Sequence, residues 1–225
     1  MPRQPYPLDR VTPERIAETA LAILDSAGPG ALSFRSLAQH LGVSHMTIYR
    51  RCSDLDGLLD LCVDHLAAYL PDSVPGSDWA RVTETRFTGL YILLTTHPGL
   101  MALRGARPWL GEQLLRRLVE PAVGDNIAVG MSAQEAVLTY RRMYLLTLGC
   151  ASFVDHRNPN TVIANVRTTI TGLDPQEFPA LTGNLEAILP IMSDDEIYYG
   201  ALRQLIRSAR PETSEPPAGS HHRRG

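Results

Sequence analysis

The chain has 225 residues, of which 44% are hydrophobic, and a formal net charge of −3 at pH 7. This length fits one large domain or two small ones with an ordinary apolar fraction. The net negative charge excludes a protein that binds nucleic acid only by nonspecific charge attraction. Three scattered cysteines exclude a disulfide framework. The longest mostly apolar stretch, 144–154, is well short of the ~20 residues that span a bilayer, which excludes a transmembrane helix there.

Residues 1–11 are rich in proline and lack the apolar core of a signal peptide. We therefore expect a loose N-terminal segment on a cytoplasmic protein. A helix is predicted over 12–27, because Thr12 can cap it, Pro13 suits its first position and Gly28 can end it. One buried stripe is expected on this helix, made of Ile16, Ala20, Ile23, Leu24 and Ala27.

Two short helices joined by a glycine turn are predicted over 33–52. In the first, Ser33 is the cap and the apolar stripe consists of Phe34, Leu37, Ala38 and Leu41. Gly42 follows the stripe and suits a left-handed turn.

The second of these helices has very little apolar surface. Ser44 can cap it, and Val43 and Ile48 can form a hydrophobic staple. Only Cys52 shares the inner face of Ile48, so the other side chains of this helix point outward. Burial of two residues does not explain why this helix is present, whereas insertion of its exposed polar surface into a DNA groove does. The alternative is an ordinary helical hairpin in a core.

A small basic patch accompanies this helix, because residues 33–51 contain three arginines and no acidic residue. We predict DNA contacts from Arg35, Ser44, His45, Met46, Thr47, Tyr49, Arg50 and Arg51. Thr47 and Tyr49 are placed to touch phosphates, whereas His45, Met46 and Arg50 are better placed for base edges. For Arg51 the simpler interpretation is a solvated surface charge.

The helix over 12–27, the stretch 37–44 (Leu-Ala-Gln-His-Leu-Gly-Val-Ser) and the Thr-Ile-Tyr core at 47–49 resemble the N-terminal domain of the TetR family of bacterial transcription regulators. Segments 103–108 and 147–150 resemble, more weakly, the C-terminal domain of the tetracycline-repressor type. The resemblance implies a dimeric regulator that binds operator DNA through its first domain and a small-molecule effector through its second.

Two departures from the family pattern stand out. Family members often carry a lysine near the start of the fourth helix, but the stretch 53–57 contains none, so Arg50 or Arg51 would replace that phosphate contact. Tetracycline repressors hold drug-bound magnesium with a histidine before an Arg-Pro pair. Here Leu103 or its neighbour stands before Arg107-Pro108, so a tetracycline–magnesium inducer is not expected.

A longer helix is predicted over 53–70, with Ser53 and Asp56 as a capping-box pair. Its apolar face holds Leu55, Leu58, Leu59, Cys62, Leu66, Tyr69 and Leu70. This helix is long enough to leave the DNA-binding unit, which makes it the natural mechanical link to the next domain. The stretch 71–77 has the composition of a linker.

The remainder is expected to be helical, with helices over 78–96, from 110 to about Val119 and ended by Pro121, over 132–153 and over 193–209. Ser132 with Glu135 and Ser193 are the predicted caps of the last two. Residues 155–175 give no assignment because the run is β-branched and polar. Residues 211–225 are rich in proline and expected to be disordered.

The helix near 132–153 is apolar over more than one face, and the helix near 193–209 has one wide apolar seam, made of Ile197, Tyr198, Ala201, Leu202, Leu205 and Ile206. Opposite its main stripe, the first carries Met143, Leu146, Cys150 and Phe153. Because a helix that is apolar all round must be covered on both sides, we predict that the two helices form a four-helix bundle with a second subunit across a twofold axis.

A ligand pocket is predicted between the helices of the C-terminal part, where helical proteins hold apolar ligands. Its candidate residues are Leu66, Phe87, Leu90, Leu94, Leu103, Arg104, Arg107, Tyr140, Met143, Tyr144 and Thr147. Each apolar candidate has plain core as its alternative, and the two arginines have a surface or capping role. An arginine that faced the cavity would select a ligand with an anion or a strong acceptor.

The sequence therefore predicts an all-α protein with an N-terminal three-helix helix-turn-helix domain and a larger C-terminal helical domain for ligand binding and dimerisation. The predicted divisions are a DNA-binding domain (1–55), a connecting helix and linker (56–77), a regulatory and dimerisation domain (78–210) and a tail (211–225). The predicted function is that of a repressor that releases a palindromic operator when a small-molecule inducer binds.

No enzyme activity, cofactor or metal is expected. The sequence has no Gly-x-Ser-x-Gly elbow, no His-Glu-x-x-His and no phosphate-binding glycine loop. Cys62 and His65 share a helix face, but two ligands do not make a zinc site. The alternatives that remain are a constitutive DNA-binding activator, a helical ligand-binding protein without DNA affinity, and a helical domain adapted to catalysis.

Overall fold

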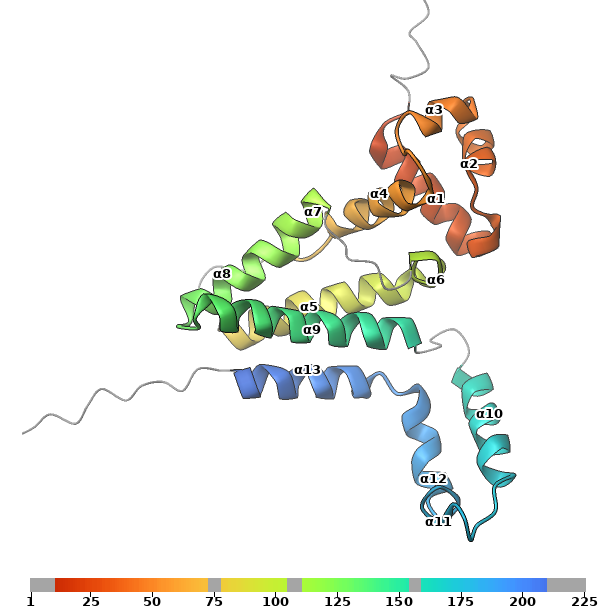
Figure 1. Cartoon of the computed structure of the whole chain (residues 1–225), viewed down its shortest axis with the longest axis vertical. Coiled ribbons are helices and arrows are strands. Elements are labelled where there is room, and N and C mark those ends of the chain that lie inside the picture. Colours follow the sequence, from red (N-terminus) through yellow and green to blue (C-terminus); the bar gives the residue numbers. More distant parts are fainter. Residues whose placement is uncertain (1–10, 73–77, 105–110, 154–158, 210–225) are drawn as a thin grey trace, which may run out of the picture.

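The computed structural model of the chain describes residues 11–72, 78–104, 111–153 and 159–209. Within these ranges the chain is helical and contains no strand, which confirms the predicted fold class. The first helices are α1 (Pro13–Ala27), α2 (Phe34–Leu41), α3 (His45–Tyr49) and α4 (Leu55–Ala67). They lie together at one end of the molecule, with α4 leading away from the other three (Figure 1). The predicted loose N-terminal segment (1–11, except Val11) and the predicted tail (211–225) lie outside the described residues.

The first two helices begin and end where local sequence signals predict. Thr12 caps α1 through its side chain, and Gly28, with a φ of 79°, follows its last residue. Ser33 and Ser36 form a reciprocal capping box at the start of α2. Gly42 ends α2 in the left-handed region, at φ 67° and ψ 33°, where a side chain would add strain.

The prediction for the fourth helix was wrong at both ends. Its cap is Asp54 and not Ser53, because Asp54 Oδ1 accepts a hydrogen bond from the Gly57 amide at 2.8 Å. A carboxylate also interacts favourably with the positive end of the helix dipole. The regular helix ends at Ala67, and Leu70 is buried in the turn that follows.

The remaining helices that surround the main core are α5 (Trp79–Thr96), α6 (Pro98–Arg104), α7 (Glu112–Leu114), α8 (Glu120–Ala128), α9 (Ala133–Phe153) and α13 (Glu196–Ala209). Helices α5, α9 and α13 pack on one another along their lengths (Figure 1). Their shared core includes Phe87, Leu90, Met143, Tyr144 and Leu202, each buried to at least 97%. Ser132 and Glu135 form the predicted cap of α9.

Pro121 does not end a helix, contrary to the prediction. Helices α7 and α8 are joined by a π-helical turn, Leu115–Val119, and the helical path continues through Pro121. A proline lacks an amide hydrogen and its ring crowds the preceding turn. A wider π-turn directly before it relaxes that crowding, so the chain stays helical.

The segment 159–193, here called the arm, leaves the end of α9 and returns to α13. It contains α10 (Pro159–Thr171), α11 (Pro179–Thr182), α12 (Leu185–Ile188) and a 3₁₀ turn, Leu189–Ser193. Residues 155–175, for which no structure was predicted, include all of α10. This β-branched helix packs against the 3₁₀ turn, and Arg167 on its exposed side forms an ion pair of 2.8 Å with Glu186. The arm projects from the rest of the molecule (Figure 1).

Helix α13 begins at Glu196, later than the predicted start at Ser193. The carboxylate of Asp194 accepts a hydrogen bond from the Glu196 amide at 2.8 Å. The preceding residues belong instead to the 3₁₀ turn of the arm. The structure therefore places the junction between arm and α13 at Asp194 and Asp195.

A buried polar network ties α5 to α8 and α9. Arg86, only 2% exposed, forms an ion pair of 2.5 Å with Asp125. The Trp79 indole donates to Asn126 Oδ1 at 2.8 Å, and the Asn126 amide donates to the carbonyl of Ala136 at 3.0 Å. Because buried polar groups are costly when unpaired, this network fixes the relative positions of the three helices.

Candidate DNA interface and regulatory core

Helix α3 is anchored by a single buried side chain of its own. Ile48 is fully buried, and Cys52 just after the helix is 2% exposed. Ser44 Oγ accepts from the Thr47 amide at 3.3 Å and shares a hydrogen bond of 3.0 Å with Thr47 Oγ1. The Ser44 cap therefore fixes the start of the helix and the buried Ile48 fixes its inner face, while most of its other side chains are available to a partner.

Most of the residues predicted to touch DNA are exposed: Arg35, Ser44, His45, Met46, Tyr49, Arg50 and Arg51. Thr47 is half-buried, and its hydroxyl shares a hydrogen bond with that of Ser44. The Tyr49 ring packs edge-to-face on Phe34 of α2, with centroids 4.4 Å apart, and stays 48% exposed. This contact fixes the direction of the Tyr49 side chain. Helices α2 and α3 together lie at the tip of the molecule (Figure 1).

A cluster of tyrosines occupies the core between α5, α9 and α13. The rings of Tyr91 and Tyr198 stack with centroids 3.8 Å apart and 13° between their planes. The Tyr198 hydroxyl donates to the carbonyl of Phe87 at 2.8 Å and lies 3.0 Å from Thr147 Oγ1. The Tyr91 hydroxyl donates to Asp195 Oδ1 at 3.1 Å, beside the start of α13.

Burial is the main cause of the raised pKa values of Tyr91, Tyr140 and Tyr198. These phenols therefore stay protonated over the physiological pH range and act as neutral hydrogen-bonding groups. Sequence reasoning missed Tyr91, Tyr198 and Tyr199. Tyr198 and Tyr199 are adjacent in the helix predicted over 193–209, and this aromatic pair is the sequence signal that could have drawn attention to them.

Comparisons with known proteins agree with this arrangement. No family model matches the chain. The structure of ActR from Streptomyces coelicolor in complex with actinorhodin superimposes with a TM-score of 0.73 and 25% identity, covering 88% of this chain and 95% of that chain. Apo ActR gives a TM-score of 0.72 at 25% identity, covering 89% and 95%. The chain has the fold of the TetR family of transcription regulators.

The curated relatives are regulators of the helix-turn-helix type. The repressor DrrR1 of Streptomyces coeruleorubidus is 31% identical over 107 residues, which are 47% of this chain and 40% of that protein. A transcriptional regulator of Saccharopolyspora erythraea is 26% identical over 183 residues, covering 79% of this chain and 76% of that protein. The match to DrrR1 thus spans less than half of either protein.

Within this TetR-like fold, most of the predicted ligand-binding residues are buried: Leu66, Phe87, Leu90, Leu94, Tyr140, Met143, Tyr144 and Thr147. Leu103 is half-buried on α6. Arg107 and the side chain of Arg104 lie outside the described residues. Leu66 belongs to α4, whereas the buried candidates from Phe87 onward belong to α5 and α9.

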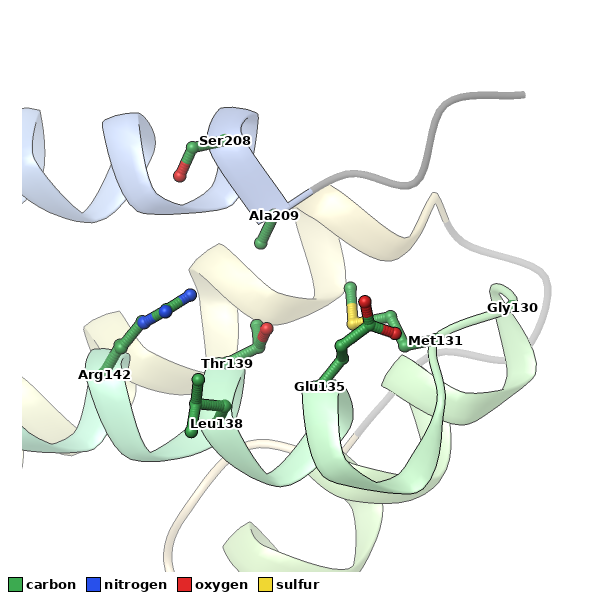
Figure 2. Close-up of a pocket in the computed structure, with 8 residues that line it drawn as sticks. All are labelled: Gly130, Met131, Glu135, Leu138, Thr139, Arg142, Ser208 and Ala209. Carbon is green, nitrogen blue, oxygen red and sulfur yellow. The ribbon is translucent and has the colours of Figure 1, made fainter. Parts of the chain in front are cut away.

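Two open grooves lie elsewhere. One, of about 500 Å³, lies between the start of α9 and the end of α13 and is lined by Gly130, Met131, Glu135, Leu138, Thr139, Arg142, Ser208 and Ala209 (Figure 2). The other, of about 260 Å³, lies between α1, α4 and α7 and is lined by Pro13, Glu14, Leu61, Asp64, His65, Ala68 and Gln113. Neither groove contains any of the predicted ligand residues.

Among the described residues, no group of three or more His, Cys, Asp or Glu side chains could hold a metal ion. Burial raises the pKa of the Cys62 thiol to about 12, so the thiolate that a metal or a nucleophilic reaction requires is disfavoured there. No helix in the described part of the chain has both the length and the apolar character needed to cross a membrane.

Proposed function

We propose that this protein is a cytoplasmic repressor that binds a palindromic operator as a homodimer and releases it when a small-molecule inducer binds. The observation that carries the proposal is α3 itself: Ile48 is its only buried residue, while His45, Arg50 and Arg51 beside it are exposed. This arrangement suits a helix that enters the major groove. The regulators of similar fold and sequence support the same conclusion.

In this proposal the side chains of α3 divide the work of recognition. His45, Met46 and Arg50 read base edges, and Thr47 and Tyr49 touch phosphates. Arg35 and Arg51 add phosphate contacts. Ser44 also contacts a phosphate, in addition to capping α3. Because the chain carries a net negative charge, these local contacts and not overall attraction would supply the affinity.

A homodimer is favoured by apolar side chains that the single chain leaves exposed. On α9 these are Val137, Leu138 and Leu145, each at least 45% exposed, and on α13 Ile197 is 47% exposed. A second copy that packed α9 and α13 against their equivalents would cover them in a four-helix bundle. The dimer would present two copies of α3, which must lie ~34–36 Å apart to enter successive major grooves.

We further propose that the inducer is a flat aromatic compound that binds near the tyrosine cluster of α5, α9 and α13. The cluster combines aromatic side chains with neutral hydrogen-bonding hydroxyls, which is the composition that aromatic ligands favour in a binding site. The relative ActR has been solved in complex with actinorhodin. Release would follow if the ligand binds more tightly to a state in which the two copies of α3 have another spacing.

The test is an electrophoretic mobility shift with the DNA upstream of the protein's own gene, with and without compounds extracted from the purified protein and identified by mass. We expect a specific complex that weakens steeply with salt and dissociates when the bound compound is added back. Binding that no compound affects would favour a constitutive DNA-binding activator. No specific DNA binding at all would favour a ligand-binding protein and refute the proposal.

A further inference from the structure

Helix α7 begins without a cap from its own segment. Its N-cap position is Gly111, which has no side chain, so the orphan amides of the first turn need another partner. Asp64 of α4 supplies it: Asp64 Oδ1 accepts from the Gln113 amide at 2.7 Å and from the Leu114 amide at 3.2 Å. The start of one helix is thus held by a carboxylate from a helix about fifty residues earlier.

The glycine at the N-cap position leaves room for this carboxylate. A Cβ atom added to Gly111 would lie 2.6 Å from Asp64 Cγ and 2.9 Å from Asp64 Cβ, closer than real Cβ atoms come. The backbone of Gly111, at φ −63° and ψ 153°, is one that any residue adopts. The need for glycine at this position is therefore steric, and it arises from the approach of Asp64.

The two helices joined by this contact have different neighbours. The inner face of α4 packs on α1, where Leu58, Leu59 and Cys62 are buried, so α4 moves with the helices that carry α3. Helix α7 continues through the π-turn into α8, which packs on α9. The groove of about 260 Å³ lies beside Asp64 and leaves part of this junction unfilled. Figure 1 shows α7 meeting α4 where the two parts of the molecule join.

We propose that Asp64 is the positioning residue that couples α7 to α4 and so sets the spacing of the two α3 helices in the dimer. This inference rests on the proposed function. Asp64 acts through the helices, by giving α4 one preferred position against α7. A second tie between the two helical segments is the ion pair between Arg117 of the π-turn and Asp72, which follows α4. A shift of α7 would break the hydrogen bonds of Asp64 unless α4 followed.

The decisive comparison separates helix capping from coupling. Asp64→Ala removes both. Asp64→Ala/Gln113→Asp restores only the stabilisation of the α7 start, because an aspartate in the first turn of α7 interacts favourably with its orphan amides and leaves Gly111 without a Cβ. Asp64→Asn keeps an oxygen acceptor without charge and serves if the alanine variant does not fold. Glu112→Ala, which removes an exposed ion pair with Arg116, is the matched control.

The first measurement is hydrogen exchange by mass spectrometry on the full chain, which needs neither DNA nor inducer. In Asp64→Ala we expect exchange about tenfold faster in both α7 and the second half of α4. In Asp64→Ala/Gln113→Asp the protection of α7 returns while α4 still exchanges faster. Asp64→Asn should lie between wild type and Asp64→Ala, and Glu112→Ala should resemble wild type.

The second measurement uses DNA selected from a random library by the wild-type protein, with a matched probe that carries one extra central base pair. The double variant should discriminate between the two probes about threefold less than wild type, because its α3 helices sample more spacings. If the double variant regains wild-type exchange in α4 and wild-type discrimination, Asp64 is only a cap and the inference is wrong. If the wild type selects no DNA, the proposed function fails, while the exchange data still decide whether Asp64 couples the helices.

Discussion

The dependence of α3 on Ile48 gives the most direct stability prediction. Ile48→Ala removes three carbon atoms from a side chain with no exposed surface. At about 0.8 kcal/mol for each buried methylene, the lost transfer energy is about 2.4 kcal/mol, and the cavity left behind raises the expected cost to about 3–4 kcal/mol. Because α3 has no other buried residue of its own, the helix should lose its fixed position as well.

The assay is urea unfolding followed by circular dichroism, with DNA affinity measured on the same samples. Met46→Ala is the matched control, since Met46 lies on the same helix and is 55% exposed. We expect Met46→Ala to change the free energy of unfolding by less than about 0.5 kcal/mol. It should still lower DNA affinity if Met46 contacts base edges. A loss below about 1 kcal/mol for Ile48→Ala would refute the reasoning that this side chain anchors the reading helix.

Three further predictions concern the proposed contacts with DNA, the core and the partner subunit. Arg50→Ala should weaken specific DNA binding by about 1–3 kcal/mol if Arg50 reads a guanine, and unchanged affinity in a titration would remove it from the interface. Tyr198→Phe should lower the free energy of unfolding by about 1–3 kcal/mol, because the buried hydroxyl donates to the Phe87 carbonyl and contacts Thr147; a loss within error in urea unfolding would contradict this. Leu145→Glu, on the exposed face of α9, should shift the protein from dimer to monomer in analytical ultracentrifugation, whereas a dimer of wild-type strength would mean that another surface is used.

Local signals were sufficient for the N-terminal helices. The caps of α1 and α2, the left-handed Gly42 and the burial of Ile48 and Cys52 follow from hydrogen bonds and spacings within a few residues. Where two local signals competed, the prediction failed by a small margin. At the start of α4, two adjacent residues could cap, and only the positions of their side chains decided for Asp54.

The predictions failed more strongly where packing outweighs propensity. Residues 159–171 are rich in β-branched side chains and gave no assignment, yet they form α10 because the returning segment of the arm packs on them. Pro121 indicated the end of a helix, but the π-turn before it lets the helix continue. Neither result can be obtained from helix propensities alone.

The amino-acid sequence by itself determined an all-α chain, the position of its helix-turn-helix and the face of α3 that stays exposed, because periodicity, caps and glycine turns act over one or two helical turns. Only the tertiary structure decided which distant groups meet: Tyr91 with Tyr198 in the core, and Asp64 with the first amides of α7. The physical reason is that a hydrogen bond or ring stack between helices depends on their relative placement, and the packing of the whole chain fixes that placement.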